Sequence, residues 1–398
     1  MDKRTIAIIC PSKYPVPATS GGAIETLIEI FLDENEIYKE CDFLVYSYFD
    51  GNAKEESREY KNTKFKYIKV NSIFEKVDNF FVRIIRKLFR MNINPYFLRK
   101  VIKDIKEKNI QKVIIEGNKH YVIPIKKGIK EAKVFLHIHH EAFNDEYNKN
   151  IEIADNCDNI ITVSEYIKRK TCENEKINKD KVIVLNNCTN INKFNKANYN
   201  NEKIELREKY NIRKDEIVIL FSGRILEIKG IRELIIAFKK YCKDLNAKLL
   251  IVGNAGFGKS VTSEYDNEII NISKEIEDKI IFTGFIKNCE IPKLHSIVDI
   301  SVVPSIWDDP APLVVIESMA SGIPLIVTNS GGIPEYVNDK CAIIIKRDIN
   351  IIDSIGKNLL KLINNDEVRI QMGGSARENA LKFSTTNYYY NFIKILKE

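Results

Sequence analysis

The sequence contains no hydrophobic run long enough to cross a bilayer, no C-x-x-C pair and no D-x-D triplet. A transmembrane helix requires about 20 consecutive apolar residues, so a membrane-spanning protein is not expected. The eight cysteines are scattered and several lie in strand-like runs, which indicates reduced thiols of a cytosolic protein and disfavours a cysteine-based metal site. The missing D-x-D triplet fits a site that works without a metal ion. The N-terminal apolar run, Ile6 to Cys10, is short, so we expect a first β-strand there and not a secretion signal.

What is present is the composition of a globular protein. The chain has 398 residues, of which 44% are hydrophobic and 29% charged, and this length favours two domains that each bury a core. The formal net charge of +7 is concentrated between Lys76 and Lys108. That segment carries ten Lys and Arg against three acids, a local balance of 10 − 3 = +7.

Strand-like and helix-like patterns alternate along both halves of the chain, which predicts an α/β fold with doubly wound parallel sheets. The Asn-rich segment from Phe194 to Lys203 has no apolar periodicity and is interpreted as a linker. We therefore expect one domain at residues 1–200, a second at 201–381 and a C-terminal helix at 382–398 that packs back on the first domain. The expected strands are Thr5–Ile9, Phe43–Tyr46, Phe65–Val70, Val113–Glu116, Val134–His137, Ile160–Val163, Val182–Leu185, Ile217–Phe221, Leu249–Val252, Ile280–Phe282, Ile300–Val303, Pro324–Val327 and Ala342–Ile345.

The segment from Pro304 to Val337, PSIWDDPAPLVVIESMASGIPLIVTNSGGIPEYV, has the order strand, loop, helix, strand. Pro312 stands where a helix accepts proline, because the first N–H groups have no intrahelical partner. Asp309 lies in the loop and Glu317 eight positions later, about two helical turns on. Anionic ligands bind at such loops, at the carboxyl edge of a sheet and the positive end of a helix. Alone, the pattern is also typical of any α/β protein.

Two further loops carry candidate binding residues. The first strand is followed by a long loop that ends in Gly21-Gly22 before a helix, where backbone N–H groups can approach an anion. A flexible turn is the alternative. The second half opens with ILFSGRILEIKG, in which Arg224 and Lys229 follow a strand and precede a helix. Two converging cations there suit a diphosphate, which they can neutralise without Mg²⁺.

The run VFLHIHHEAF places three of the five histidines, His137, His139 and His140, at a strand end. Alternation puts His137 and His139 on one face, which could suit a metal ion. Glu141 is the only acid immediately adjacent, however, and zinc sites rarely use i, i+2 histidines alone. We expect one histidine to act as a hydrogen-bonding group in the site, with a buried structural role as the alternative for the other two.

Two other motifs define competing functions. Gly253 to Ser260 matches the phosphate-loop pattern G-x-x-x-x-G-K-[ST], which predicts an ATPase or kinase. That match leaves the first half of the chain unexplained, and the next strand, IIFTGF, lacks the terminal Asp that would organise Mg²⁺. We interpret it as a coincidence in a Gly-rich turn. In the basic segment, residues 76–108, apolar residues from Phe80 to Phe89 form one helical face flanked by Arg and Lys. This favours an interfacial helix on an anionic membrane surface over an ordinary packed helix, and nucleic acid is not expected.

Taken together, the ordered motifs resemble a retaining glycosyltransferase of family 4. The series consists of the GGAIE loop, the strand-end histidines, VSEYIK, SGRILEIKG, LLIVGNAG, FTGF, PSIWDDPAPLVVIESMASGIP and GGIPEYV. The resemblance covers nearly the whole chain and is strongest from Phe221 to Val337. It implies the GT-B fold, two Rossmann-like domains with a ligand cleft between them.

The resemblance also assigns roles to residues. Glu317 corresponds to the acid that holds the donor ribose, and Asp309 to the family's paired glutamate, which faces the sugar hydroxyls. The sequence departs from the family in having the shorter Asp at position 309 and Ala311-Pro312 where many relatives have Phe-Gly. Pro312, Leu313 and Val314, together with Arg224 and Lys229, correspond to the residues that bind the diphosphate, and Gly21 and Gly22 lie near the same phosphates. Phe285 and Ile286 correspond to the residues beside the base. His139 corresponds to the cleft histidine, and His140 is the alternative for that role.

The implied function is transfer of a hexose from a nucleoside-diphosphate sugar, expected to be a UDP-sugar, with retention and without metal or other cofactor. The implied acceptor is a saccharide or lipid-linked saccharide in the synthesis of a bacterial surface polysaccharide such as a capsule. We expect a cytoplasmic protein that attaches peripherally to the inner face of the membrane. Besides the ATPase or kinase, a sugar-nucleotide epimerase or a binding protein is the alternative.

Overall fold

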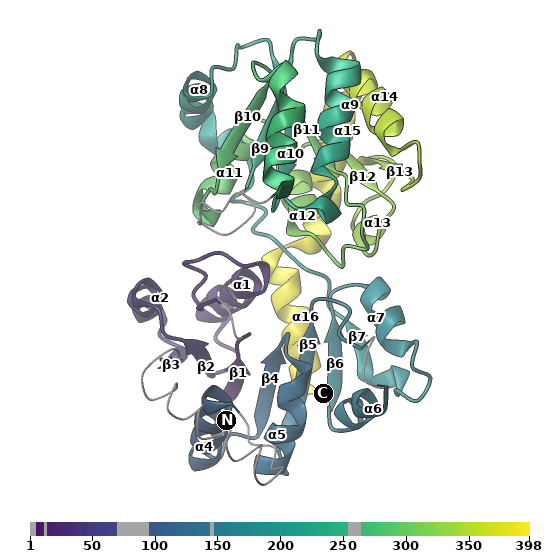
Figure 1. Ribbon diagram of the computed structural model, residues 1–398. Coiled ribbons are helices and arrows are strands. Elements are labelled where there is room, and N and C mark those ends of the chain that lie inside the picture. Colours follow the sequence, from purple (N-terminus) through teal and green to yellow (C-terminus); the bar gives the residue numbers. More distant parts are fainter. Residues whose placement is uncertain (1–4, 12–13, 70–94, 144–146, 254–263) are drawn as a thin grey trace. The chain divides into compact units, whose positions relative to one another are not determined.

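The structure is a computed structural model that describes residues 5–11, 14–69, 95–143, 147–253 and 264–398. The chain divides into two compact units (Figure 1). Unit 1 comprises Met1–Asn186 and Tyr388–Glu398, and unit 2 comprises Asn187–Asn387. The boundary between the units thus falls at Asn187 and not at residue 201, where the sequence pattern placed it.

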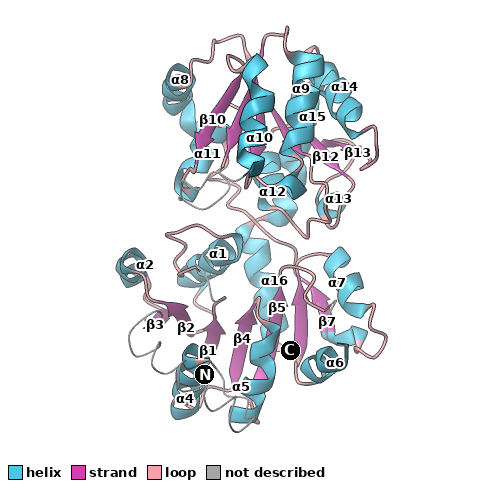
Figure 2. Cartoon of the chain, in the orientation of Figure 1, coloured by secondary structure: helices cyan, strands magenta, loops and turns pink. Residues whose placement is uncertain are grey.

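In unit 1, the described strands form a seven-stranded parallel sheet in the order β3-β2-β1-β4-β5-β6-β7, flanked by helices (Figure 2). The strands are β1 Ile6–Ile9, β2 Phe43–Tyr48, β3 Thr63–Ile68, β4 Lys112–Glu116, β5 Lys133–Ile138, β6 Asn159–Thr162 and β7 Val182–Val184. The helices are α1 Ala23–Tyr38, α2 Gly51–Glu56, α4 Tyr96–Glu107, α5 Val122–Gly128, α6 Tyr147–Asp155, α7 Glu165–Cys172 and the C-terminal α16 Thr385–Lys397.

In unit 2, the described strands form a six-stranded parallel sheet in the order β10-β9-β8-β11-β12-β13. The strands are β8 Ile217–Ser222, β9 Ala247–Val252, β10 Ile280–Gly284, β11 Ile300–Val303, β12 Leu325–Thr328 and β13 Ala342–Ile345. The helices are α8 Asn200–Lys209, α9 Ile231–Cys242, α10 Glu264–Ser273, α11 Ile291–His295, α12 Leu313–Ala320, α13 Ile333–Tyr336, α14 Ile351–Ile363 and α15 Asp366–Ala380. The predicted doubly wound α/β architecture is confirmed in both units.

The predicted linker at Phe194–Lys203 is wrong in part, because α8 begins inside it, at Asn200. None of the residues of α8 is buried, so its sequence has no apolar stripe by which a helix could be recognised. The chain joins unit 2 earlier, at Asn187. The Asn187 side chain donates a hydrogen bond to the carbonyl of Ala311, and its backbone N–H donates to the hydroxyl of Tyr336.

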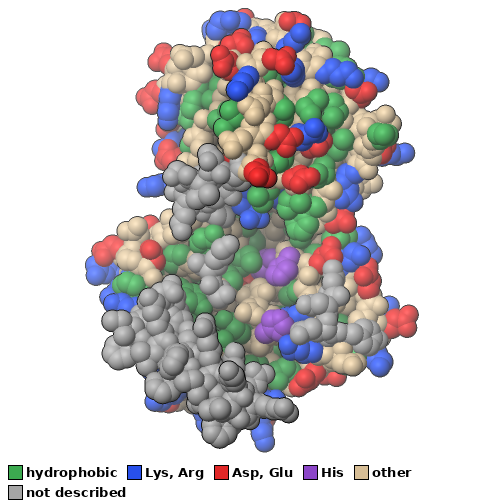
Figure 3. All heavy atoms as spheres, viewed as in Figure 1, with side chains coloured by type: hydrophobic (Ala, Val, Ile, Leu, Met, Phe, Trp, Pro, Cys, Tyr) green, Lys and Arg blue, Asp and Glu red, His purple; other side chains and the backbone are tan. Residues whose placement is uncertain are grey.

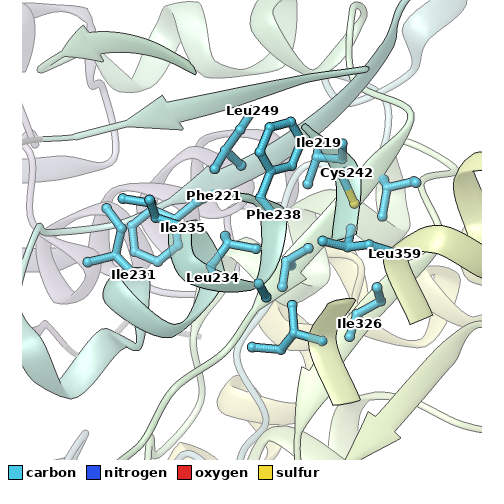
Figure 4. Packing of buried hydrophobic residues seen from close by; sticks show 14 of the residues in the cluster. Ile219, Phe221, Ile231, Leu234, Ile235, Phe238, Cys242, Leu249, Ile326 and Leu359 are labelled. Carbon is cyan, nitrogen blue, oxygen red and sulfur yellow. The ribbon is translucent and has the colours of Figure 1, made fainter. Parts of the chain in front are cut away.

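The main core of unit 2 lies between its sheet and helices α9 and α14 (Figure 4). Phe238 of α9 is fully buried among strand residues that include Ile219 and Leu249, and Leu359 of α14 packs in the same cluster. Burial of one such side chain contributes about 1.5–3 kcal/mol. The central strands are apolar on both faces, as parallel strands covered by helices on each side require.

Helix α16 completes unit 1, although it is the last element of the chain. The ring of Phe392 lies 4.7 Å from that of Phe31 in α1, and the hydroxyl of Tyr389 donates a 2.8 Å hydrogen bond to the side-chain oxygen of Asn35. At its C-terminal end, the ammonium group of Lys112 donates to the carbonyl of Leu396. A cation at this place also satisfies the negative end of the helix dipole.

Two sequence features fall largely outside the described residues. Of the basic segment 76–108, the structure describes the part from Pro95 onward, where α4 buries Phe97, Leu98 and Val101 as an ordinary amphipathic helix does. Of the phosphate-loop match, Gly253 is described and pairs with Gly284. Within the described ranges, no helix combines the length and hydrophobicity needed to cross a membrane.

Candidate functional site

The residues predicted to bind a diphosphate lie at the carboxyl edge of the unit 2 sheet. Arg224 and Lys229 follow β8, and Asp309 follows β11, the strand that pairs with β8. The chain continues from β8 to β9 on one side and reaches β11 on the other, so this edge is a topological switch point. Ligands of open parallel sheets bind at such points.

Lys229 and Asp309 form an ion pair at this edge. The ammonium nitrogen of Lys229 lies 2.5 Å from Oδ2 of Asp309, whose side chain is buried. The same nitrogen lies 5.7 Å from the ring centre of Trp307, close enough for a cation–π attraction. Arg224, in contrast, is exposed, and its side chain makes no hydrogen bond or ion pair with another described residue. The structure therefore brings one predicted cation onto the predicted acid and leaves the other available.

Gly230 allows the Lys229 loop to approach the end of β11. It has φ 70°, and a Cβ at this position would lie 1.9 Å from the carbonyl oxygen of Pro304. The two loops are also joined by a 3.0 Å hydrogen bond from the N–H of Ile306 to the carbonyl of Ile228. This contact holds Lys229 beside the loop that carries Asp309.

The Asp309 loop is fixed from its other side by the loop after β12. The carboxylate of Asp308 accepts from the N–H of Gly331 and forms a 2.6 Å ion pair with Arg347, which follows β13. The N–H of Gly332 donates to the backbone carbonyl of Asp309 at 2.8 Å. Three consecutive strand ends thus hold the loop, so the position of Asp309 depends on the sheet and not on its own flexible segment.

Helix α12 begins immediately after this loop. Pro312 is its N-cap residue, and the first intrahelical acceptor, the Pro312 carbonyl, is taken by Val315. The N–H groups of Leu313 and Val314 precede that bond and have no backbone partner in the described chain. They are the donors that an anion at a helix N-terminus uses.

Glu317 lies one turn farther along α12. Its carboxylate has no hydrogen-bond or ion-pair partner among the described residues, and burial raises its pKa to about 7. A carboxylate that lacks partners in a partly buried position is destabilised until a ligand supplies hydrogen-bond donors. Glu317 is suited to accept hydrogen bonds from a bound hydroxyl-bearing group.

The predicted base-binding residues follow β10 at the same edge. Gly284 ends the strand with φ 69°, Phe285 is 39% exposed, and Ile286 packs partly against the smaller core cluster of the unit. Phe285 is therefore one of the exposed large hydrophobic residues of the described chain. An exposed aromatic ring at a sheet edge can stack on a planar group.

In unit 1, the first loop is arranged differently from the expectation. The N–H of Gly21 already donates to the carbonyl of Ala18. Gly22 is the N-cap of α1, and the carboxylate of Glu25 lies 2.2 Å from the place that a Gly22 Cβ would take. The positive end of α1 thus carries a carboxylate from its own first turn. An anion-binding role of Gly21 and Gly22 stays a prediction.

Two histidines of unit 1, His137 and His139, form a cluster with an acid that the sequence patterns did not single out, Glu116. In the register of β4 and β5, Glu116 is paired with His137. Its carboxylate lies 3.1 Å from Nδ1 of His137 and 2.9 Å from Nε2 of His139. His140 is exposed and does not contact Glu116. Figure 3 shows histidine side chains at the surface of this unit.

The protonation of the cluster follows from its surroundings. Burial acts to raise the pKa of Glu116, but the charge and hydrogen bonds of His137 and His139 outweigh it and lower this pKa to about 2. Burial, with the neighbouring His137, lowers the pKa of His139 to about 4 against the opposing effect of Glu116. At neutral pH the carboxylate is ionised and His139 is uncharged.

The same three side chains have the composition of a small metal site, since one ligand atom from each lies within 4.8 Å of the others. The two imidazole nitrogens that face the carboxylate are, however, each within hydrogen-bond distance of it. A metal ion would have to replace both hydrogen bonds. The geometry is therefore satisfied as a hydrogen-bonded cluster.

Sequence patterns alone missed Glu116, Asp308, Trp307 and Arg347. A signal existed for Glu116, because the run KVIIE ends in an acid at the edge where all parallel strands of a sheet end. Arg347 offered none, because its partner Asp308 is 39 positions away in the sequence.

The chain is similar to known glycosyltransferases. Residues 202–379 match the family described as glycosyl transferases group 1. The putative glycosyltransferase YtcC of Bacillus subtilis is 27% identical over 381 residues, which cover 94% of this chain and 87% of YtcC. A lipopolysaccharide 1,2-N-acetylglucosaminetransferase of Salmonella typhimurium is 29% identical over 265 residues, 65% of each chain.

The fold has solved counterparts. The structure of Anabaena Alr3699/HepE in complex with UDP and glucose superimposes with a TM-score of 0.77, at 17% identity, over 99% of each chain. The two parallel-sheet units and this likeness establish the GT-B fold. Residues 202–379, which make up most of unit 2, thus match the group 1 glycosyltransferases, and the chain is similar to YtcC over nearly its full length.

Proposed function

We propose that this protein is a retaining glycosyltransferase that transfers a hexose from a nucleoside-diphosphate sugar, with UDP as the nucleotide, to a saccharide or lipid-linked saccharide. The product belongs to a cell-surface polysaccharide. The observation that carries the proposal is the arrangement at the carboxyl edge of unit 2, where Lys229, the start of α12 and the partner-free Glu317 follow neighbouring strands.

Each part of a nucleotide sugar has a counterpart in this arrangement. The diphosphate suits the N–H groups of Leu313 and Val314 together with the cations Lys229 and Arg224. The ribose hydroxyls suit the carboxylate of Glu317. A hydroxyl donates to a carboxylate and an N–H donates to a phosphate oxygen, so the two ends of the ligand are distinguished by chemistry.

The names of similar proteins support the choice of substrates. The aligned Salmonella protein is named for transfer of N-acetylglucosamine to lipopolysaccharide, and the Anabaena structure contains UDP and glucose. These names fit the proposed reaction, in which a UDP-sugar is the donor and a saccharide is the acceptor.

The reaction needs charge stabilisation more than a protein nucleophile. As the bond between the anomeric carbon and the phosphate oxygen breaks, the sugar gains oxocarbenium character and the diphosphate gains negative charge. Arg224, Lys229 and the start of α12 stabilise that charge where it develops. The acceptor hydroxyl attacks from the face that the diphosphate leaves, and its proton passes to the departing phosphate oxygen. Because the hydroxyl attacks the face that the leaving group vacates, the configuration is retained without a covalent intermediate.

A panel of nucleoside-diphosphate sugars tests the proposal. A ligand present at 100 times its dissociation constant stabilises the folded state by about 2.7 kcal/mol, which a thermal-shift screen detects. Transfer with the best donor is then followed by NMR of the anomeric proton, and we expect the configuration of the donor. Inversion contradicts the retaining mechanism. Interconversion of the donor without an acceptor identifies an epimerase, and ATP hydrolysis abolished by Lys259→Ala identifies a phosphate-loop enzyme.

Membrane attachment is part of the proposal for a lipid-linked acceptor and rests on the charge of the basic segment. We expect co-sedimentation with anionic vesicles that weakens when Arg83, Arg86, Lys87 and Arg90 are neutralised together, because each cation near an anionic surface contributes about 1 kcal/mol. Binding that is unchanged in this variant contradicts attachment through the segment.

A further inference from the structure

The carboxylate of Glu116 stands between two imidazole rings at the carboxyl edge of the unit 1 sheet. Its oxygens lie 3.1 Å from Nδ1 of His137 and 2.9 Å from Nε2 of His139, and the ring centres are 4.1 Å apart. The side chains of Glu116 and His137 are 3% and 1% exposed, and that of His139 is 8% exposed. All three positions are set by the pairing of β4 with β5 and by the N–H of Gly117, which donates to the carbonyl of His137.

This geometry decides where the protons are. An ionised carboxylate only accepts hydrogen bonds, so each ring nitrogen that faces Glu116 must carry a hydrogen. The hydrogens are therefore on Nδ1 of His137 and on Nε2 of His139. The low pKa of Glu116 and the lowered pKa of His139 support an ionised carboxylate beside a neutral His139 ring.

The remaining nitrogens of the two histidines have different surroundings. Nε2 of His137 is buried without a partner, and its ring packs edge-on against Phe392 of α16. Nδ1 of His139 has no hydrogen bond to a described residue, yet it is not among the buried atoms that lack a partner. The nitrogen of His139 that is left over is therefore accessible, and in a neutral ring it carries a lone pair.

We propose that Glu116 is a positioning residue that holds His139 as the Nε2–H tautomer, so that His139 meets the substrate as a hydrogen-bond acceptor through Nδ1. The inference rests on the proposed function. Its partner is a hydroxyl group, because a phosphate or carboxylate oxygen cannot donate a hydrogen bond to a lone pair. His139 thus contacts a sugar hydroxyl and does not contribute to binding of the diphosphate.

The groups around His139 keep this state stable at neutral pH. Glu116 and His137 are in contact with it, and His140 is a nearby titratable neighbour. The Cys10 thiol lies in the same region, and burial with the charges of Glu116 and Glu25 raises its pKa. Without the carboxylate, a neutral histidine can carry its hydrogen on either nitrogen, and the nitrogen that faces the substrate becomes a donor in part of the molecules.

The test compares ¹⁵N-histidine NMR spectra of the full chain at pH 7.5 with those of Glu116→Gln. His139 is assigned with the His139→Gln variant. We expect the Nε2–H tautomer in the wild-type protein. It should be lost in part in Glu116→Gln, because a neutral amide is a weaker acceptor than an ionised carboxylate and can turn its NH2 group, a donor, towards His139. In the transfer assay kcat should fall about 10–100-fold, the usual effect of removing a residue that orients a functional histidine. UDP binding should be unchanged.

Two further variants separate positioning from structural damage. His137→Gln removes the other imidazole and leaves Glu116 for His139. His139 should therefore keep the Nε2–H tautomer in this variant, and kcat should stay within about threefold of the wild-type value. Glu116→Asp keeps the charge and both acceptor oxygens, and it should recover part of the activity that Glu116→Gln loses.

Several results would overturn the inference. They are an Nδ1–H or doubly protonated His139 in the wild-type protein, stoichiometric zinc in the purified protein, and wild-type kcat in a Glu116→Gln variant whose tautomer has changed. The NMR measurement needs no substrate. It therefore stands if no transferase activity is found, whereas that outcome contradicts the proposed function itself.

Discussion

Lys229 forms an ion pair with Asp309, with 2.5 Å between its ammonium nitrogen and Oδ2 of the carboxylate. The two residues are 80 positions apart in the sequence, and the β8–β11 pairing brings them together. A cation expected to bind the diphosphate is thus already held by the acid expected to face the sugar. The arrangement orients Lys229 before the donor arrives, so less side-chain entropy is lost on binding.

The ion pair should contribute measurably to stability, because Asp309 is buried and its other side-chain partner, Ser305, is 3.4 Å away. We expect Lys229→Met to lower the free energy of unfolding by about 1–3 kcal/mol, since it leaves a buried carboxylate without its cation. Lys229→Met with Asp309→Asn should cost less than the sum of the single changes. Urea denaturation measures the cycle.

The exposed pair Arg58–Glu55 is the matched control, with a similar distance of 2.6 Å but side chains that are 69% and 68% exposed. No measurable coupling is expected there. Additive effects of Lys229→Met and Asp309→Asn would show that the ion pair is not formed in solution.

Arg224 should matter for catalysis and not for stability. Its side chain is exposed and has no partner among the described residues, so Arg224→Ala should leave the unfolding midpoint unchanged. Loss of one preorganised charge should lower kcat about 10²–10³-fold. Arg224→Lys keeps the charge but loses the planar guanidinium group, so its kcat should lie between those of the wild type and Arg224→Ala.

Donor binding to these variants can be followed by fluorescence, because Trp307 is the only tryptophan of the chain and lies beside Lys229. Near-wild-type kcat for Arg224→Ala would contradict its assignment to the diphosphate.

Glu317 should make both donor binding and stability depend on pH. The ionised carboxylate accepts hydrogen bonds from ribose hydroxyls, so donor affinity should rise as pH increases through about 7, the pKa of Glu317. Because the folded state favours the protonated form, the free energy of unfolding should fall between pH 4.5 and 7, by up to about 3 kcal/mol, and then level off.

Glu317→Gln should remove both dependences and should weaken donor binding above about pH 7, where the wild-type carboxylate is ionised. Isothermal titration calorimetry and urea denaturation at pH 5, 6, 7 and 8 measure them. A pH-independent affinity of the wild-type protein would exclude Glu317 as the ribose ligand.

Gly230 should tolerate no side chain, whereas Gly284 should tolerate one at moderate cost. Both have φ near 70°, but a Cβ at Gly230 would lie 1.9 Å from the Pro304 carbonyl, and a Cβ at Gly284 meets nothing within 4 Å. Gly284→Ala should cost about 1–2 kcal/mol for the left-handed backbone alone. Gly230→Ala should cost more, because the clash with the Pro304 carbonyl is added to the same backbone strain. The clash should also displace Lys229, so kcat should fall as well.

Thermal denaturation and the transfer assay compare the two alanine variants. Equal destabilisation would mean that the loops after β8 and β11 are not in close contact.

The architecture, and the sheet edge that carries the candidate site, could be predicted from the sequence alone. Alternating apolar patterns are local, and they placed nearly every strand of both sheets within one or two residues. Parallel strands all end at one edge, so the loops that carry Arg224, Asp309 and Gly22 were expected at the carboxyl edges where they lie. The eight-residue spacing of Asp309 and Glu317 on one loop and helix needed no tertiary information.

The tertiary structure alone decided which side chains meet. Glu116 reaches His139 because β4 and β5 are neighbours in a fixed register, and apolar patterns do not encode strand order or register. For the same reason the contact of Lys229 with Asp309 was not foreseen. The polar helix α8 and the boundary at Asn187 escaped prediction because neither has an apolar stripe. Local periodicity specifies the elements, but the pairing of elements distant in sequence specifies the chemistry at their ends.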